Sequence, residues 1–75
     1  MLAEIKPCAK SDARFAIRMA MGQLLDYQQR HRANPIHLLV VLEVKPDTED
    51  TELAIMNGFG IAYPWGAGFV LKWPS

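Results

Sequence analysis

The tripeptide Glu4-Ile5-Lys6 brings together two side chains whose types and spacing could support chemistry. Alternate residues of a β-strand point to the same face, so a strand here places the Glu4 carboxylate beside the Lys6 ammonium. A carboxylate can bind a divalent cation, and a neighbouring lysine can position an attacking water while it faces a phosphate. A solvated ion pair on an edge strand has the same sequence, so the surrounding elements decide between the two interpretations.

A long amphipathic helix is predicted over residues 12–32, directly after this strand. Its apolar residues recur at the three- and four-residue spacing of one helical face: Ala13, Ala16, Ile17, Ala20, Leu24 and Tyr27. Gln23 and Tyr27 are four residues apart, so they lie one turn apart on one side of the helix. Gly22 has no side chain and is expected where the helix closely approaches the sheet or another helix.

Two strands flank this helix. Leu2–Lys6 is the first, and residues 36–44, IHLLVVLEV, have the nearly unbroken aliphatic content of a strand that is buried on both faces. A strand, a helix and a second strand in this order form a βαβ unit with a right-handed crossover. We therefore expect the two strands to be parallel neighbours.

The sequence of the second half of the chain predicts one more helix, followed by a β-hairpin. The helix should begin at Asp47 or Thr48 and end at Asn57-Gly58, with Leu53, Ile55, Met56 and Phe59 buried. Residues 60–63 and 68–73 should form a hairpin at the other edge of the sheet. The predicted fold class is α/β, a single domain over residues 1–75 with a small open mixed sheet in β-α-β-α-β-β order.

Composition gives the chain no overall charge but an uneven distribution of charge. Residues 1–37 carry six basic and three acidic side chains, whereas residues 38–75 carry two basic and five acidic ones. The basic half makes Lys10, Arg14 and Arg18 candidates for contact with a nucleic-acid backbone, although a complementary self-contact explains the same pattern equally well. The single cysteine, Cys8, and the lack of a leader or spanning segment predict a cytoplasmic protein with no membrane contact.

Other kinds of reactive site find little support. Cys8, His31 and His37 match no metal-ligand spacing, and the two histidines flank a proline. The serines lack the strand-turn-helix context of a nucleophile elbow. The glycine pairs lack the lysine and the following helix of a phosphate-binding loop.

The sequence resembles the second half of the PD-(D/E)xK phosphodiesterase superfamily, which includes restriction and repair nucleases. AEIKP is similar to the (D/E)xK strand, GQLLDY to the Q-x-x-x-Y helix of one branch, and IHLLVVLEV to the parallel strand that follows. The resemblance implies that Glu4 is a ligand of Mg²⁺ and Lys6 the catalytic lysine. It also implies that Gln23 and Tyr27 flank a nucleic-acid backbone.

The chain departs from the family ahead of this motif. Family members carry a metal-binding Asp on a hairpin strand before the (D/E)xK strand, whereas only Met1, Leu2 and Ala3 precede Glu4 here. A single carboxylate holds Mg²⁺ weakly. The expectation is a truncated restriction endonuclease-like core with little or no catalysis as an isolated chain.

Three functions therefore stay open. The first is a nuclease-like, nucleic-acid-associated protein that acts as an oligomer, and the second is a non-catalytic interaction or self-assembly module of the same fold. The third is a metal-dependent nuclease whose site is completed by a second chain. In each case the unpaired edge at Leu2–Lys6 and the C-terminal aromatic hairpin favour a homo-oligomer built through one of them.

Overall fold

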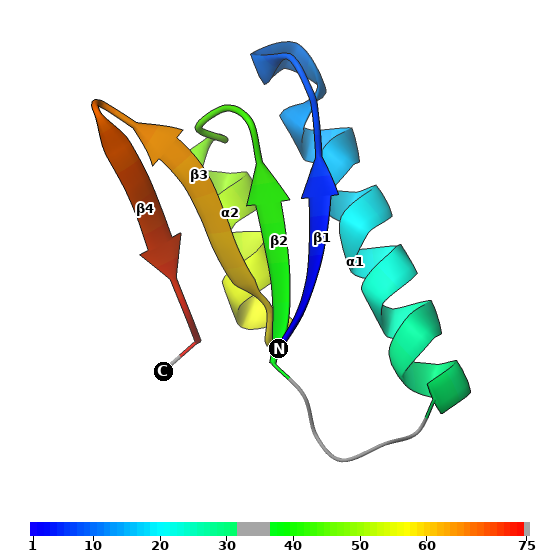
Figure 1. The fold of residues 1–75 in the computed structure, drawn as a ribbon. Helices are drawn as coiled ribbons and strands as arrows, with labels where there is room; N and C mark the ends of the chain where they lie inside the picture. The colour runs from blue at the N-terminus through cyan, green and yellow to red at the C-terminus, as the bar shows by residue number, and fades with distance from the viewer. Residues whose placement is uncertain (32–36, 75) are drawn as a thin grey trace.

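Two helices cover one face of a four-stranded sheet in the computed structural model, which describes residues 1–31 and 37–74 (Figure 1). The elements follow one another as β1 (Leu2–Lys6), α1 (Ala13–His31), β2 (Leu38–Leu42), α2 (Thr48–Met56), β3 (Gly60–Trp65) and β4 (Gly68–Lys72). A short 3₁₀ turn at Lys10–Asp12 leads into α1. The predicted α/β class and element order are confirmed. The predicted end of the first helix at residue 32 and the start of the second strand at residue 36 lie outside the described residues.

The sheet has the strand order β1-β2-β3-β4. Strands β1, β2 and β3 are parallel, and β4 returns antiparallel to β3, so the sheet is mixed and open. Leu2 lies opposite Leu38, and its backbone N–H donates to the carbonyl of His37 at 2.8 Å. The parallel pairing of the first two strands that the βαβ order predicts is therefore confirmed.

The hydrophobic core lies between the sheet and the helices. Alternate residues of β2 and β3 face the helices and meet the buried stripe of α1, so the core contains Ile17, Ala20, Leu24, Leu38, Val40, Leu42, Ala54, Phe59, Ile61 and Tyr63. The stripe of α1 follows the predicted spacing through Leu24. Tyr27 lies outside the core with 44% of its surface exposed, and this corrects its assignment to the buried face.

Helix α2 buries a different set of residues from the one predicted. Met56 is 84% exposed and Leu53 and Ile55 are only partly buried, whereas Asp50, Thr51 and Ala54 form the buried side of the helix. These three residues share one face at helical spacing, and that face meets α1. The prediction followed hydrophobicity, but Asp50 is buried because arginines of α1 lie against it. Phe59, just after the helix, is buried as expected.

Gly22 is not a point of close approach. It is exposed, and a methyl group at its Cα would meet nothing within 4 Å. Gly22 lies two residues from both Ala20 and Leu24, which places it on the side of α1 that faces away from the sheet. Close approach occurs instead at Gly60, where the ring of Trp73 occupies the space that a side chain would need.

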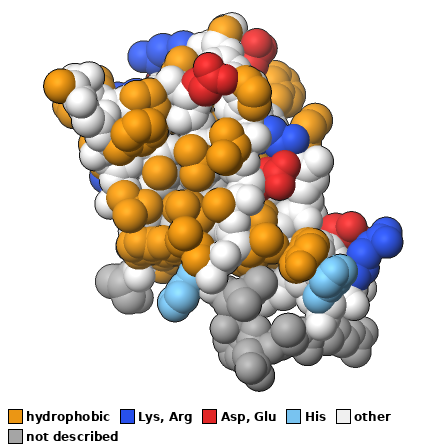
Figure 2. Space-filling model, in the orientation of Figure 1, with side chains coloured by type: hydrophobic (Ala, Val, Ile, Leu, Met, Phe, Trp, Pro, Cys, Tyr) orange, Lys and Arg blue, Asp and Glu red, His pale blue; other side chains and the backbone are white. Residues whose placement is uncertain are grey.

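No helix of residues 1–31 and 37–74 lies on the second face of the sheet. Residues that alternate with the core-facing ones point to this side, which we call the open face: Met1, Ala3, Ile5, Leu39, Val41, Gly60, Ala62, Pro64, Phe69, Leu71 and Trp73. Figure 2 looks onto the sheet from the side away from the helices and shows hydrophobic side chains gathered over the strands. The fold thus leaves a broad apolar surface in contact with water.

Candidate functional site

Glu4 and Lys6 lie side by side on β1, on the side that faces the helices. Lys6 Nζ is 3.6 Å from Glu4 Oε1, and their side chains are 18% and 33% exposed respectively. In the sheet register Glu4 lies opposite Val40 and Lys6 opposite Leu42, and both partners are fully buried. The pair therefore combines an apolar floor with access to solvent along the edge of the sheet, and the pairing that strand alternation predicts is confirmed.

The two side chains of this pair are of the types that a metal-dependent phosphodiesterase site uses. Glu4 offers one carboxylate, and Lys6 offers a cation that can face a phosphate. Among residues 1–31 and 37–74, no three or more His, Cys, Asp or Glu side chains gather into a potential metal site. Magnesium in proteins is held by one or two carboxylates together with waters and substrate phosphates.

Gln23 and Tyr27 lie on α1, which packs against β1 and β2. Both side chains are exposed. The Tyr27 ring packs on the ring of His31, one turn further along, with 4.0 Å between the ring centroids and 34° between the planes. The single continuous helix confirms that Gln23 and Tyr27 lie one turn apart, and the contact with His31 is a role for Tyr27 that the sequence did not indicate.

Two basic side chains of α1, Arg14 and Arg18, contact carboxylates of α2. Arg14 Nε donates to Asp50 Oδ1 at 3.3 Å, and Arg18 Nη1 lies 3.7 Å from the same oxygen. Arg14 Nη2 is also 3.9 Å from Glu49. Two of the three basic residues that were predicted to contact nucleic acid therefore face carboxylates of their own chain, which reduces the charge that they present to a phosphate.

A polar cleft of about 360 Å³ lies beside this cluster, between the start of α1 and the start of α2. It is lined by Lys10, Ser11, Arg14, Asp47, Glu49 and Asp50. Lys10, the third predicted basic contact, is exposed on the 3₁₀ turn at the rim of this cleft. Sequence reasoning missed Asp50 as the centre of the cluster, because three neighbouring acidic residues at a helix start also suit the helix dipole.

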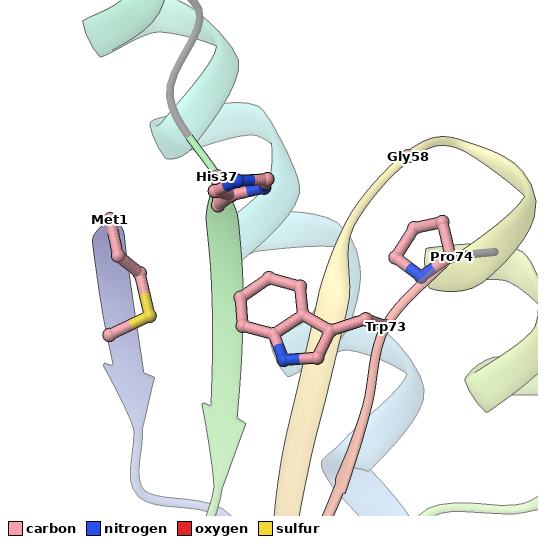
Figure 3. Close-up of a pocket in the computed structure, with 5 residues that line it drawn as sticks. All are labelled: Met1, His37, Gly58, Trp73 and Pro74. Carbon is pink, nitrogen blue, oxygen red and sulfur yellow. The ribbon is translucent and has the colours of Figure 1, made fainter.

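A second hollow lies at the opposite end of the sheet. Its volume is about 620 Å³, and it is lined by Met1, His37, Gly58, Trp73 and Pro74. Met1 and Trp73 extend toward each other across the amino end of β2, with His37 between them (Figure 3). The rings of His37 and Trp73 meet edge to face, with centroids 5.7 Å apart. The hollow is apolar, so it suits a large hydrophobic group better than an ion.

Comparison with protein families, curated proteins and solved structures finds no match to this chain. None of the helices in the described part of the chain is long and apolar enough to cross a membrane. The features of the described residues that could support a function are the Glu4–Lys6 pair, the basic residues of α1 and the open face.

Proposed function

We propose that this chain is a nucleic-acid-associated module related to the PD-(D/E)xK phosphodiesterases, which acts within an oligomer and has little or no catalysis alone. The observation that carries the proposal is the Glu4–Lys6 pair, with 3.6 Å between its charged atoms. The pair lies on an edge strand that is followed by a crossover helix and a parallel neighbouring strand. The order of strand, crossover helix and parallel strand is the one that the resemblance implies, and it supports the proposal.

In this proposal the pair lies close to a phosphate of the bound nucleic acid. Lys6 supplies a positive charge toward the phosphate, and Glu4 holds the lysine side chain in place. Lys10, on the 3₁₀ turn before α1, adds an exposed positive charge. The positive charges of Arg14 and Arg18 are instead paired with the Asp50 carboxylate. Affinity is therefore expected to be modest and largely electrostatic.

Binding of duplex DNA is expected to weaken steeply as salt increases, because each phosphate contact releases counterions. If Lys10 contacts a phosphate, Lys10→Ala should weaken binding uniformly across sequences and reduce the slope of log K against log salt by about one. Fluorescence anisotropy over a salt series measures both effects. Lys72→Ala removes another exposed lysine, at the opposite edge of the sheet, and serves as the matched control. Affinity that is independent of salt would contradict the proposal.

DNA cleavage by the purified chain with Mg²⁺ or Mn²⁺ is expected to be absent or very weak, because Glu4 alone provides a single carboxylate ligand. A gel-based nicking assay with supercoiled DNA measures it. Cleavage that is lost in both Glu4→Ala and Lys6→Ala would mean that a second chain completes the site, and the proposal of an inactive module would be wrong. Cleavage that neither substitution affects would come from a contaminant.

A non-catalytic interaction module of the same fold is the second candidate. The pairing of Arg14 and Arg18 with Asp50 favours it, because these arginines are then structural, and the chain has no net charge to attract nucleic acid. The salt series separates the two candidates, since ordinary protein contacts do not release counterions.

A further inference from the structure

We infer that the open face of the sheet binds a second copy of this chain, face to face, about a two-fold axis that passes through Leu71. This deepens the assembly part of the proposed function, which names an oligomer but no surface. It does not depend on whether the chain binds nucleic acid. It also differs from pairing through the β1 edge, because the contact is made by side chains of the sheet face.

The open face is apolar along each of its rows. One row crosses all four strands as Ile5, Val41, Ala62 and Leu71, which lie opposite one another in the sheet register. The next row runs from Ala3 through Leu39 to Gly60, and Trp73 lies against Gly60. Charged residues of β1 and β4, namely Glu4, Lys6 and Lys72, point to the helix side by the same alternation. Two copies can therefore stack without bringing like charges together.

The exposed area is large enough for a specific dimer. The five large side chains of this face, Met1, Ile5, Phe69, Leu71 and Trp73, are between 39% and 76% exposed. At roughly 200 Å² for a large side chain, they present about 600 Å² per copy before smaller residues are added. Two copies would bury about 1,200 Å², the lower limit for stable specific interfaces. A surface of this size lies at the upper end of the apolar patches that monomeric proteins expose, and patches of that size are often functional.

The shape of the face identifies a second copy as the occupant. Phe69, which is 72% exposed, projects at one end of β4, and the 620 Å³ hollow beside Trp73 lies at the other end. Leu71 lies midway between them along the strand. A two-fold axis through Leu71, at right angles to the strands and between the two sheets, places Phe69 of each copy against Trp73 of the other, at the wall of the hollow. The contact is then isologous, and each copy provides both a projection and a hollow.

Packing at the usual distance between stacked sheets, about 10 Å, gives these side chains room to interdigitate. In this arrangement β4 lies over the partner's β4 in the opposite direction, and β1 lies over the partner's β1. Leu71 of each copy meets its symmetry mate at the centre. A charge introduced at position 71 would therefore be buried in the interface in both copies, and each charge would face an identical one.

The test is the oligomeric state of Leu71→Lys, measured by light scattering and sedimentation velocity over a micromolar dilution series. We expect the wild-type chain to be a dimer and Leu71→Lys to raise its dissociation constant by at least about 100-fold, because two like charges would meet at the centre. Leu25→Lys is the matched control. Leu25 is 51% exposed and Leu71 is 54% exposed, but Leu25 lies on α1, away from the open face. The control should remain a dimer.

Two further variants keep the outcomes distinct. Phe69→Lys tests the same face at the other end of the strand and should also dissociate the dimer, with the fold of each variant checked by circular dichroism. Ala3→Pro removes a backbone N–H from the outer edge of β1, since the neighbouring Leu2 N–H points inward to His37. We expect Ala3→Pro to remain a dimer.

If Ala3→Pro loses the dimer while Leu71→Lys and Phe69→Lys keep it, the inference is wrong and the contact lies on the outer edge of β1. The proposal that the chain acts as an oligomer would still stand. A well-folded monomer throughout the dilution series would overturn both. The salt dependence of DNA binding is read separately, so the nucleic-acid part of the proposed function is judged on its own.

Discussion

Phe59→Ala is expected to leave the protein largely unfolded at 25 °C. Phe59 is among the largest side chains that are fully buried, with 1% of its surface exposed, and it closes the core where α2 ends and β3 begins. Truncation of a buried phenylalanine costs about 3–5 kcal/mol. The core of a domain of this size rarely supplies more than about 3–5 kcal/mol in total, so one substitution removes most of the stability.

Circular dichroism and amide chemical-shift dispersion would measure this loss of structure. Phe15→Ala is the matched control, because Phe15 lies on α1 and is 69% exposed. Its loss should change the free energy of unfolding by no more than about 0.5 kcal/mol. A cooperative thermal transition for Phe59→Ala near the wild-type Tm would show that the core does not depend on this ring.

Asp50→Ala is expected to lower the free energy of unfolding by about 2 kcal/mol. The carboxylate accepts a hydrogen bond from Arg14, lies 3.7 Å from Arg18, and occupies the positively polarised first turn of α2. The arginines are about half exposed, so each ion pair is discounted for solvent screening, but Asp50 itself is only 6% exposed. The lost charge-assisted hydrogen bond and the lost charge at the helix start together give this value.

Thermal denaturation should show a Tm lower by roughly 10 °C for a domain of this length. Glu49→Ala provides the control, since Glu49 is the preceding acidic residue and approaches Arg14 only at 3.9 Å with its side chain 86% exposed. Its removal should cost less than about 0.5 kcal/mol. Equal losses of stability in the two variants would show that burial of Asp50 contributes nothing beyond its charge.

The sequence predicts most of the backbone arrangement because each element carries a local signal. Leu2–Lys6, the long helix and the aliphatic strand that follows occur in the order of a βαβ unit, and this order favours parallel strands, as observed. Gly66, with its positive φ of 60°, allows the tight turn between β3 and β4, where Trp65 lies opposite Gly68. These features depend on residues that are close in sequence.

Burial is harder to predict, because it depends on what lies across from a side chain. Met56 has a hydrophobic side chain at the end of α2, but no element in the described part of the chain covers it, and it is 84% exposed. Asp50 is buried because Arg14 and Arg18, more than thirty residues earlier in the chain, neutralise it. Likewise, strand alternation separates two faces of the sheet but does not say which face the helices cover.

The candidate site also has one part that the sequence predicts and one part that it does not. The Glu4–Lys6 pair is predicted because it depends only on the alternation of one strand. The apolar hollow is not predicted, because Met1, His37 and Trp73 come from three distant parts of the sequence. Only the folded sheet brings the ends of their strands together.

The strand order of the sheet has a consequence for folding during synthesis. Because β1, β2, β3 and β4 lie in the sheet in the order in which they occur in the chain, each new strand joins an edge that already exists. No later segment must insert between strands that have already paired. A ribosome releases the amino terminus first, so the sheet can grow strand by strand as the chain emerges, and the local β3–β4 hairpin closes last.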